Sequence, residues 1–337
     1  DYVIKPFSAE VLSLRIDKAV QKKRVFRSFY DLREFRRLDD AILELEMLLE
    51  QEQAKPYRYD VLRYRAETLA DAGRTADALE AYEEIVAGFP FPWAKAGLAR
   101  MLHRQERLDE ARSAIDDVID MSPNYFEAYD LKATICADAG DYETAQKTLT
   151  RASERSPRNW QRKRTLSGIA LNNGDAETAA ALMREVIQND SLAGVSAEDR
   201  LAMARCALAS GDAEATKAAL EAMASLDTSS LEPAARLEAE CVLAILEGEQ
   251  GAERYERVRR TIAETPEVPV QTSVDIVRAA LAFDDRQMSD LTIEKMLIGK
   301  QARLAFQPLF AIYREHALEE HFRKVQNRAA LKRLNRL

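Results

Sequence analysis

Small and apolar residues recur at helical spacing through most of the chain. In the best-marked part, residues 59–223, larger apolar side chains stand three or four positions apart, as do Ile115 and Val118. This is the spacing of one face of a helix. The pattern breaks at residues such as Gly73 and Pro90, because glycine adopts the left-handed conformation that ends a helix and proline cannot continue one. The chain is therefore predicted to form short helices joined by tight turns.

Three columns of residues share a period of 33 or 34 residues. Two columns consist of small residues, which let two antiparallel helices approach closely, and the third consists of prolines that stop the second helix. The columns are Ala66, Ala99, Ala133 and Ser167; Ala78, Ala111, Ala145 and Ala179; and Pro90, Pro123 and Pro157. The turn between the two helices holds Gly73, Gly140 and Gly174, with Glu106 at the equivalent place in the second unit. Each unit is predicted to be a helical hairpin followed by a proline.

At these residues the chain resembles the tetratricopeptide repeat family, whose units of about 34 residues stack into a right-handed superhelix. The resemblance is clear over residues 59–190, and a fifth unit is expected at 210–223. A degenerate unit containing Ala41 stands in front. The expected fold class is all-α, a right-handed superhelix (α-solenoid) of tetratricopeptide helix hairpins.

The first residues do not follow the repeat. A β-rich run, residues 2–4, ends at Lys5-Pro6, and a helix with Ser8 as its N-cap is expected to follow. The string KPFSAEVL resembles the end of a response-regulator receiver domain, where the lysine contacts a phosphoryl group on an aspartate. The resemblance implies that an upstream receiver is phosphorylated by a histidine kinase and that the sequence is a cut-down piece of a longer protein. An unrelated strand, turn and helix is the alternative.

Four segments are expected. Residues 1–24 are the receiver remnant, 25–58 a linker helix with a degenerate repeat, 59–231 the tetratricopeptide repeats, and 232–337 divergent helical repeats that end in a capping helix. The last helix carries an apolar stripe made of Leu318, Phe322, Val325 and Ala329. This stripe is expected to cap the array, and the alternative is that it binds a partner.

Composition and charge narrow the function classes. Of 337 residues, 47% are hydrophobic and 31% are charged, as in a soluble folded protein, and no apolar run is long enough to span a membrane. The net charge of −8 divides into +5 for residues 1–37, +6 for 300–337 and −19 between them. An acidic body argues against nucleic-acid binding. An odd number of cysteines without metal spacing predicts reduced thiols and a cytoplasmic location.

Motifs for catalysis are missing from the sequence. The three histidines are His103, His316 and His321, and the last two are five residues apart, which does not suit chelation on one helix. No phosphate loop or nucleophile motif is present. The sequence therefore predicts a protein that is not an enzyme and has no metal site and no cofactor.

The resemblance implies a concave groove lined by the first helix of each unit. Carried over position by position, the groove residues include Trp93, Arg100, His103, Arg104, Asp130, Arg164 and Asn172. Arginine and tryptophan often anchor interfaces, so the three arginines predict a protein or peptide partner with an acidic segment. The alternative is that these arginines pair with neighbouring acids. The pattern that clamps a C-terminal carboxylate in co-chaperones is not present.

The sequence thus predicts the protein-binding output module of a two-component response regulator. In that hypothesis, one unbroken helix runs from the receiver remnant into the first repeat and transmits its movement. A constitutive tetratricopeptide scaffold or adaptor, not controlled by phosphorylation, is the alternative.

Overall fold

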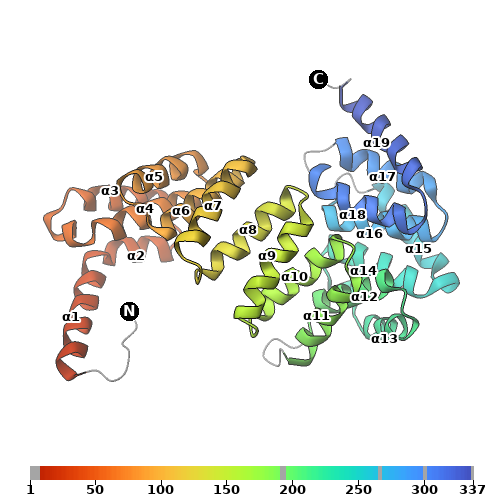
Figure 1. Cartoon of the computed structure of the whole chain (residues 1–337), viewed down its shortest axis with the longest axis horizontal. Coiled ribbons are helices and arrows are strands. Elements are labelled where there is room, and N and C mark those ends of the chain that lie inside the picture. Colours follow the sequence, from red (N-terminus) through yellow and green to blue (C-terminus); the bar gives the residue numbers. More distant parts are fainter. Residues whose placement is uncertain (1–7, 190–194, 265–267, 299–301, 335–337) are drawn as a thin grey trace. The chain divides into compact units, whose positions relative to one another are not determined.

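The computed structural model describes residues 8–189, 195–264, 268–298 and 302–334. Within these ranges the regular elements are all helices, and no strand is present. The predicted strand at 2–4 and the Lys5-Pro6 pair lie outside the described residues. The chain divides into two compact units, residues 1–131 and 132–337, which are coloured red to yellow and yellow-green to blue (Figure 1).

The first unit contains helices α1 to α7 and a 3₁₀ turn, η1. Their bounds are α1 Ala9–Val25, α2 Arg27–Glu34, α3 Leu38–Leu49, η1 Glu52–Tyr57, α4 Arg58–Asp71, α5 Thr75–Gly88, α6 Pro92–Arg104 and α7 Leu108–Met121. Helix α8, Phe126–Asp138, contains the boundary between the units.

The second unit continues the helical pairs to the end of the described chain. The bounds are α9 Tyr142–Arg155, α10 Trp160–Asn172, α11 Ala176–Asn189, α12 Ala197–Ser210, α13 Ala213–Ala224, η2 Thr228–Ser230, α14 Pro233–Leu246, η3 Gly248–Gly251, α15 Ala252–Glu264, α16 Val270–Ala282, α17 Arg286–Ile298, α18 Ala302–Glu315 and α19 Glu319–Leu334.

The columns of small residues lie where the helices touch. All seven alanines of the two columns are fully buried. Ser167, which replaces the eighth, is also buried, and its hydroxyl donates a hydrogen bond of 2.9 Å to the carbonyl of Ala179. A buried hydroxyl needs such a partner. The predicted helical hairpins are therefore confirmed, with the column residues at their contacts.

Turn and packing geometry explain two other sequence features. Gly73 and the equivalent Glu106 both have positive φ, 76° and 61°, so the turn conformation is kept where the glycine is lost. Gly97 in α6 faces the ring of Tyr82 in α5, and a Cβ at position 97 would overlap that ring. A glycine is required at position 97 because α5 and α6 approach so closely.

The prediction of one unbroken helix from the first residues into the first repeat is wrong. Ser8 does cap α1, since its side chain accepts a hydrogen bond from the N–H of Val11, but the helix ends at Val25 and α2 begins at Arg27. Between them Phe26 leaves the helical conformation (φ −95°, ψ 12°). Its ring is fully buried and lies 5.1 Å from the ring of Tyr64. Burial of Phe26 in this aromatic cluster turns the chain and separates the two helices.

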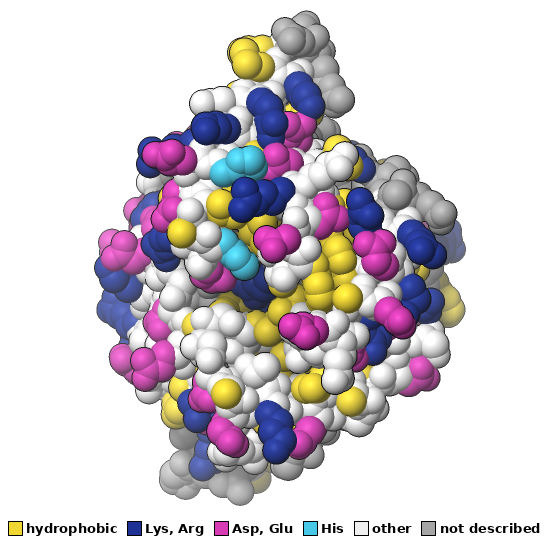
Figure 2. Space-filling view, turned by 90° about the vertical axis from the view of Figure 1, so that its right-hand side faces the viewer, with side chains coloured by type: hydrophobic (Ala, Val, Ile, Leu, Met, Phe, Trp, Pro, Cys, Tyr) yellow, Lys and Arg dark blue, Asp and Glu magenta, His cyan; other side chains and the backbone are white. Residues whose placement is uncertain are grey.

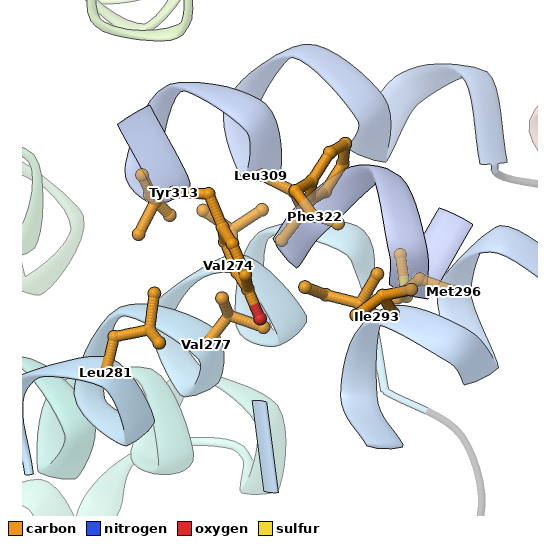
Figure 3. Close-up of a cluster of buried hydrophobic side chains, with 10 residues drawn as sticks. Val274, Val277, Leu281, Ile293, Met296, Leu309, Tyr313 and Phe322 are labelled. Atoms are coloured by element: carbon orange, nitrogen blue, oxygen red, sulfur yellow. The ribbon is translucent and has the colours of Figure 1, made fainter. Parts of the chain in front are cut away.

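A hydrophobic cluster joins the last four helices, as Figure 3 shows. Phe322, Val325 and Ala329 of α19 are 0%, 0% and 1% exposed. Phe322 packs against α18, with its ring 5.3 Å from that of Tyr313, and Leu318 packs against the edge of the cluster. The apolar stripe of the last helix is therefore buried by its own chain, as expected for a capping helix.

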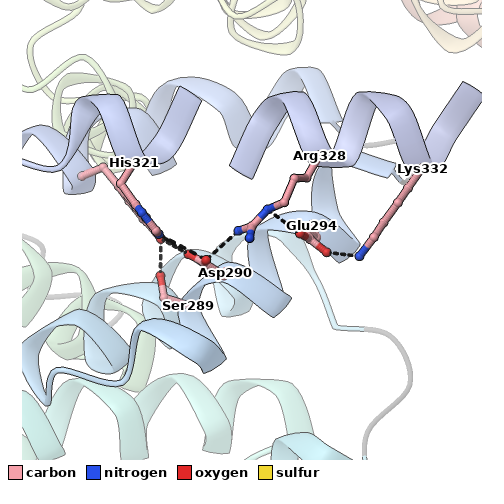
Figure 4. A network of polar contacts seen from close by, with 7 residues as sticks. Ser289, Asp290, Glu294, His321, Arg328 and Lys332 are labelled. Carbon is pink, nitrogen blue, oxygen red and sulfur yellow. Dashed lines mark hydrogen bonds and ion pairs between the residues drawn. The ribbon is translucent and has the colours of Figure 1, made fainter. Parts of the chain in front are cut away.

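Polar contacts fix the orientation of α19 on α17 (Figure 4). The His321 ring nitrogen Nε2 lies 2.9 Å from Asp290, and Arg328 donates to Asp290 at 2.7 Å. Arg328 and Lys332 also pair with Glu294. These contacts follow the outer edge of the cluster, so they favour one register of the two helices.

Candidate partner-binding surfaces

Four aromatic side chains form a continuous surface in the first unit. Phe91 is at the centre, and the centroids of the rings of Phe89, Tyr59 and Trp93 lie 4.3, 5.0 and 5.6 Å from its own. Tyr59 is 52% exposed and Phe89 is 51% exposed. We call these four residues the aromatic surface. Exposed aromatic rings that contact each other are typical of protein-interaction sites.

Arg63 borders the aromatic surface, and Arg100 lies on α6, the helix that carries Trp93. The guanidinium of Arg63 lies 5.3 Å from the centre of the Trp93 ring and also donates to Glu67 at 2.7 Å. Arg100 is exposed. Burial and then the charge of Glu127 raise the pKa of Tyr125, whereas Arg100 and Arg63 act in the opposite direction. The positive charges of Arg100 and Arg63 therefore both act on Tyr125.

The other predicted groove residues of the first unit have different surroundings. Arg104 donates a hydrogen bond of 2.8 Å to the carbonyl of Ala70 near the end of α4, so it stabilises that helix end. His103 lies in the last turn of α6. Asp130 is half-buried on α8.

In the second unit, Arg164 forms an ion pair with Asp199. Its Nε and Nη2 atoms donate to the two carboxylate oxygens at 2.7 and 3.1 Å. Burial disfavours the charged form of Asp199, but hydrogen bonds from Arg164 and Ser196 outweigh this effect, and the pKa of Asp199 is lowered. The alternative that the groove arginines pair with neighbouring acids therefore applies to Arg164. Its charge is compensated by Asp199 within the repeats.

A larger ionic group connects three further helices of the second unit. Arg205 of α12 donates to Glu238 of α14 at 2.8 Å and to Asp275 of α16 at 2.5 Å. The side chains are 13%, 15% and 1% exposed. Thr272 also donates to Glu238, at 2.7 Å. Because buried charges need partners, this group holds the consecutive first helices of the pairs together.

Asn172 lines a polar cavity of about 350 Å³ in the second unit. The cavity lies where the end of α10 meets α18, and Asn173, Phe310 and Arg314 also line it. A second cavity of about 490 Å³ lies between α14 and α15, with Leu237 and Val258 in its lining.

Figure 2, the view from the side of the second unit, shows hydrophobic side chains gathered in a hollow among charged ones.

The described residues hold no group of three or more His, Cys, Asp or Glu side chains suited to a metal ion. In the same part of the chain, no helix combines the length and apolar character that a bilayer crossing requires. Cys136, Cys206 and Cys241 are free and buried, and burial raises the pKa of the Cys241 thiol. Buried thiols of this kind are inert core residues.

Of the predicted groove residues, Trp93 and Arg100 both lie on α6 of the first unit, where Trp93 is half-buried and Arg100 is exposed. Sequence reasoning missed Phe89 and Phe91, because groove positions were counted only inside the helices. The signal was the run Phe89-Pro90-Phe91-Pro92-Trp93, which places three aromatic residues within five positions of a chain that is 7% aromatic.

Comparison with known proteins agrees with this architecture. A tetratricopeptide repeat family model matches residues 26–92, 65–126 and 132–193. Among solved structures, a tetratricopeptide repeat protein from Parabacteroides merdae has a TM-score of 0.54 at 13% identity, covering 81% of this chain and 99% of that chain. PilW, a widely conserved type IV pilus biogenesis factor, also has a TM-score of 0.54, at 19% identity, covering 66% of this chain and 98% of that chain.

One curated relative is similar to part of this chain in sequence. Cellulose synthase operon protein C of Xanthomonas axonopodis pv. citri is 29% identical over 198 residues, which are 55% of this chain and 13% of that protein. The chain thus corresponds to a small part of that relative. Taken with the buried alanine columns, these matches show that the chain contains tetratricopeptide repeats in an all-helical, solenoid-like fold.

Proposed function

We propose that this protein is a constitutive scaffold that binds a partner protein through its tetratricopeptide repeats. The observation that carries the proposal is the aromatic surface of the first unit, where Tyr59 and Phe89 are each about half exposed. A core residue would be buried, and an isolated exposed ring would need no explanation. Phe91 contacts three other rings, and two of these are about half exposed, which favours a protein-binding role.

Other observations agree with a non-enzymatic scaffold. The buried ion pairs Arg164–Asp199 and Arg205–Asp275 join helices to each other. The similar proteins belong to different systems, type IV pilus biogenesis and a cellulose synthase operon, so the repeat is what they share. We place the protein in the cytoplasm, because its three cysteines are free and reducing compartments keep thiols free.

Site-specific photocrosslinking in cells tests this function. A photoreactive residue at position 100 on α6 is expected to capture one discrete partner. The matched control is position 84 on α5, which is also exposed, where we expect no such product. The captured protein is then purified and must form a complex with this chain in gel filtration. Equal labelling at both positions, or no binary complex, would exclude the proposed scaffold role.

The response-regulator output module is the second candidate. The string KPFSAEVL at residues 5–12 supports it. So does helix α1, in which no residue is buried and Ile16 and Val20 are 53% and 43% exposed. In a receiver domain, the last helix would bury such apolar residues against the strands. Lys5 and Pro6 would then be part of an acceptor site controlled by a histidine kinase.

The preceding part of the gene discriminates between the two candidates. An intact acidic pocket with a phosphoacceptor aspartate, and incorporation of phosphate from acetyl phosphate into the natural full-length protein, would support signalling. A partner affinity that does not change on phosphorylation would leave the constitutive scaffold as the better description.

A further inference from the structure

The aromatic surface is built on a backbone with little freedom. Pro90 and Pro92 flank Phe91, and Pro92 is the first residue of α6. Proline fixes φ near −65°, and the rings on either side of Phe91 restrict its side chain. A partner that binds here therefore meets rings that are already ordered, which lowers the entropic cost of association.

Arg100 lies on the same face of α6 as Trp93. The two residues are seven positions apart, which is close to two helical turns and about 10 Å along the axis. The described part of the chain shows no acidic partner for the exposed Arg100 guanidinium. The neighbouring acid Glu67 is paired with Arg63, and Glu127 accepts a hydrogen bond from Tyr125. Arg100 is thus a positive charge available to a partner.

This inference rests on the proposed scaffold function and specifies its partner. We propose that the aromatic surface and Arg100 together bind an extended partner segment in which a proline and a carboxylate are three residues apart. Proline-rich segments dock onto aromatic surfaces in the polyproline II conformation. That conformation rises about 3.1 Å per residue, so three residues span about 9 Å. The span matches the distance between Trp93 and Arg100 along α6.

The occupant is thereby defined by shape and charge. The flat faces of proline rings pack against exposed aromatic rings, and polyproline II is already extended before binding. A carboxylate is required because the free charge at the far end is a guanidinium, which binds carboxylates in paired hydrogen bonds. A proline alone would contact only the aromatic surface, and a carboxylate alone would contact only Arg100.

A peptide titration tests the proposal on the full chain. The probe peptide has the core Asp-Pro-Pro-Pro-Asp, which offers the required spacing in either chain direction. The first control peptide has Asn in place of both Asp residues, and the second has the core Asp-Gly-Ser-Gly-Asp. Trp93 emission reports binding in a Trp160→Phe background, because the chain has two tryptophans. We expect the probe to bind about tenfold more tightly than either control.

Variants locate the site. Tyr59→Ala and Phe89→Ala should each weaken probe binding about tenfold, and Arg100→Gln should remove the preference for Asp over Asn. The matched controls are Phe35→Ala, which removes a ring that is 76% exposed in the same unit, and Arg27→Gln, the same change at another exposed arginine. Both controls should bind like the parent, and circular dichroism confirms that every variant is folded.

Three results would overturn the proposal. The first is equal affinity for the probe and the two control peptides, and the second is native affinity in the Tyr59 and Phe89 variants. The third is concentration-dependent dimerisation, abolished by Tyr59→Ala, which would make a second copy the occupant. The scaffold function is judged separately, because a partner crosslinked at position 100 that lacks the proline and carboxylate pattern would support that function and exclude only this chemistry.

Discussion

The two units use the same repeat for different purposes. In the second unit, charged residues of the first helices are paired with each other, as Arg164 is with Asp199 and Arg205 with Asp275. The first unit instead carries the aromatic surface, with Tyr59 and Phe89 about half exposed, and the exposed Arg100. The small-residue columns are buried in both units. The comparison shows that the columns determine the helical pairs, whereas the residues between the columns decide whether a unit stabilises itself or presents a surface.

The largest expected effect is in the ionic group of the second unit. Arg205→Met should lower the free energy of unfolding by about 3–5 kcal/mol, because it leaves the buried carboxylates of Asp275 and Glu238 without their cation. Urea unfolding measures the change. The triple variant with Glu238→Met and Asp275→Leu should recover most of the loss, since no unpaired charge remains. A single variant as stable as the parent would show that the group does not hold the helices together.

The second prediction concerns the C-terminal cap. Phe322→Ala should cost about 3–5 kcal/mol, because the ring is fully buried among Leu309, Tyr313 and Ile293. Leu331→Ala is the control on the same helix, where the side chain is 63% exposed and the expected change is below about 0.5 kcal/mol. Similar unfolding curves for the two variants would mean that α19 does not cap the second unit.

The alanine columns allow the same experiment in both units. Ala111→Leu in the first unit and Ala145→Leu in the second should each cost about 1–3 kcal/mol, because both side chains are fully buried at helix contacts. Ala76→Leu, at an exposed position of α5, should change stability little. If only one of the two column variants is destabilised, the columns do not have the same role in both units.

The helical pairs could be predicted from the sequence, whereas the ion pairs between units and the turn at Phe26 could not. Alanine and proline spacing predicted the helical pairs, because a contact repeated every 33 or 34 residues leaves a period in the sequence. Arg164 and Asp199 are 35 residues apart, and Arg205 and Asp275 are 70 apart, so each pairing depends on the stacking of whole units. The turn at Phe26 was missed because helix-forming residues surround it and only burial of its ring ends α1.

The fourth prediction uses the pH dependence of the Arg164–Asp199 pair. The pKa of Asp199 is lowered in the folded state, so its ionised form contributes stability above the ordinary aspartate pKa of 3.8. This contribution is lost as the pH falls through the lowered value. Asp199→Asn should therefore cost about 1–3 kcal/mol at neutral pH, and the difference from the parent should shrink in acid. Urea unfolding at several pH values measures it, and a difference independent of pH would contradict the assignment.

The smallest effect on stability is expected for a substitution of Arg100. Its comparison with the same substitution of Arg164 tests the difference between the two units most directly. Arg100→Gln and Arg164→Gln make the same change at positions expected to face one groove. Arg164→Gln should destabilise the protein by about 1–3 kcal/mol, because Asp199 is buried and loses two hydrogen bonds from a cation.

Arg100→Gln should stay within about 0.5 kcal/mol of the parent, because the side chain is exposed and the described residues give it no acidic partner. Its effect should instead appear in the loss of the probe's preference for Asp over Asn. Thermal unfolding and peptide titration on the same two variants measure both quantities. If Arg100→Gln destabilised the fold as much as Arg164→Gln, Arg100 would be a structural residue of the first unit, and its surface would not be held free for a partner.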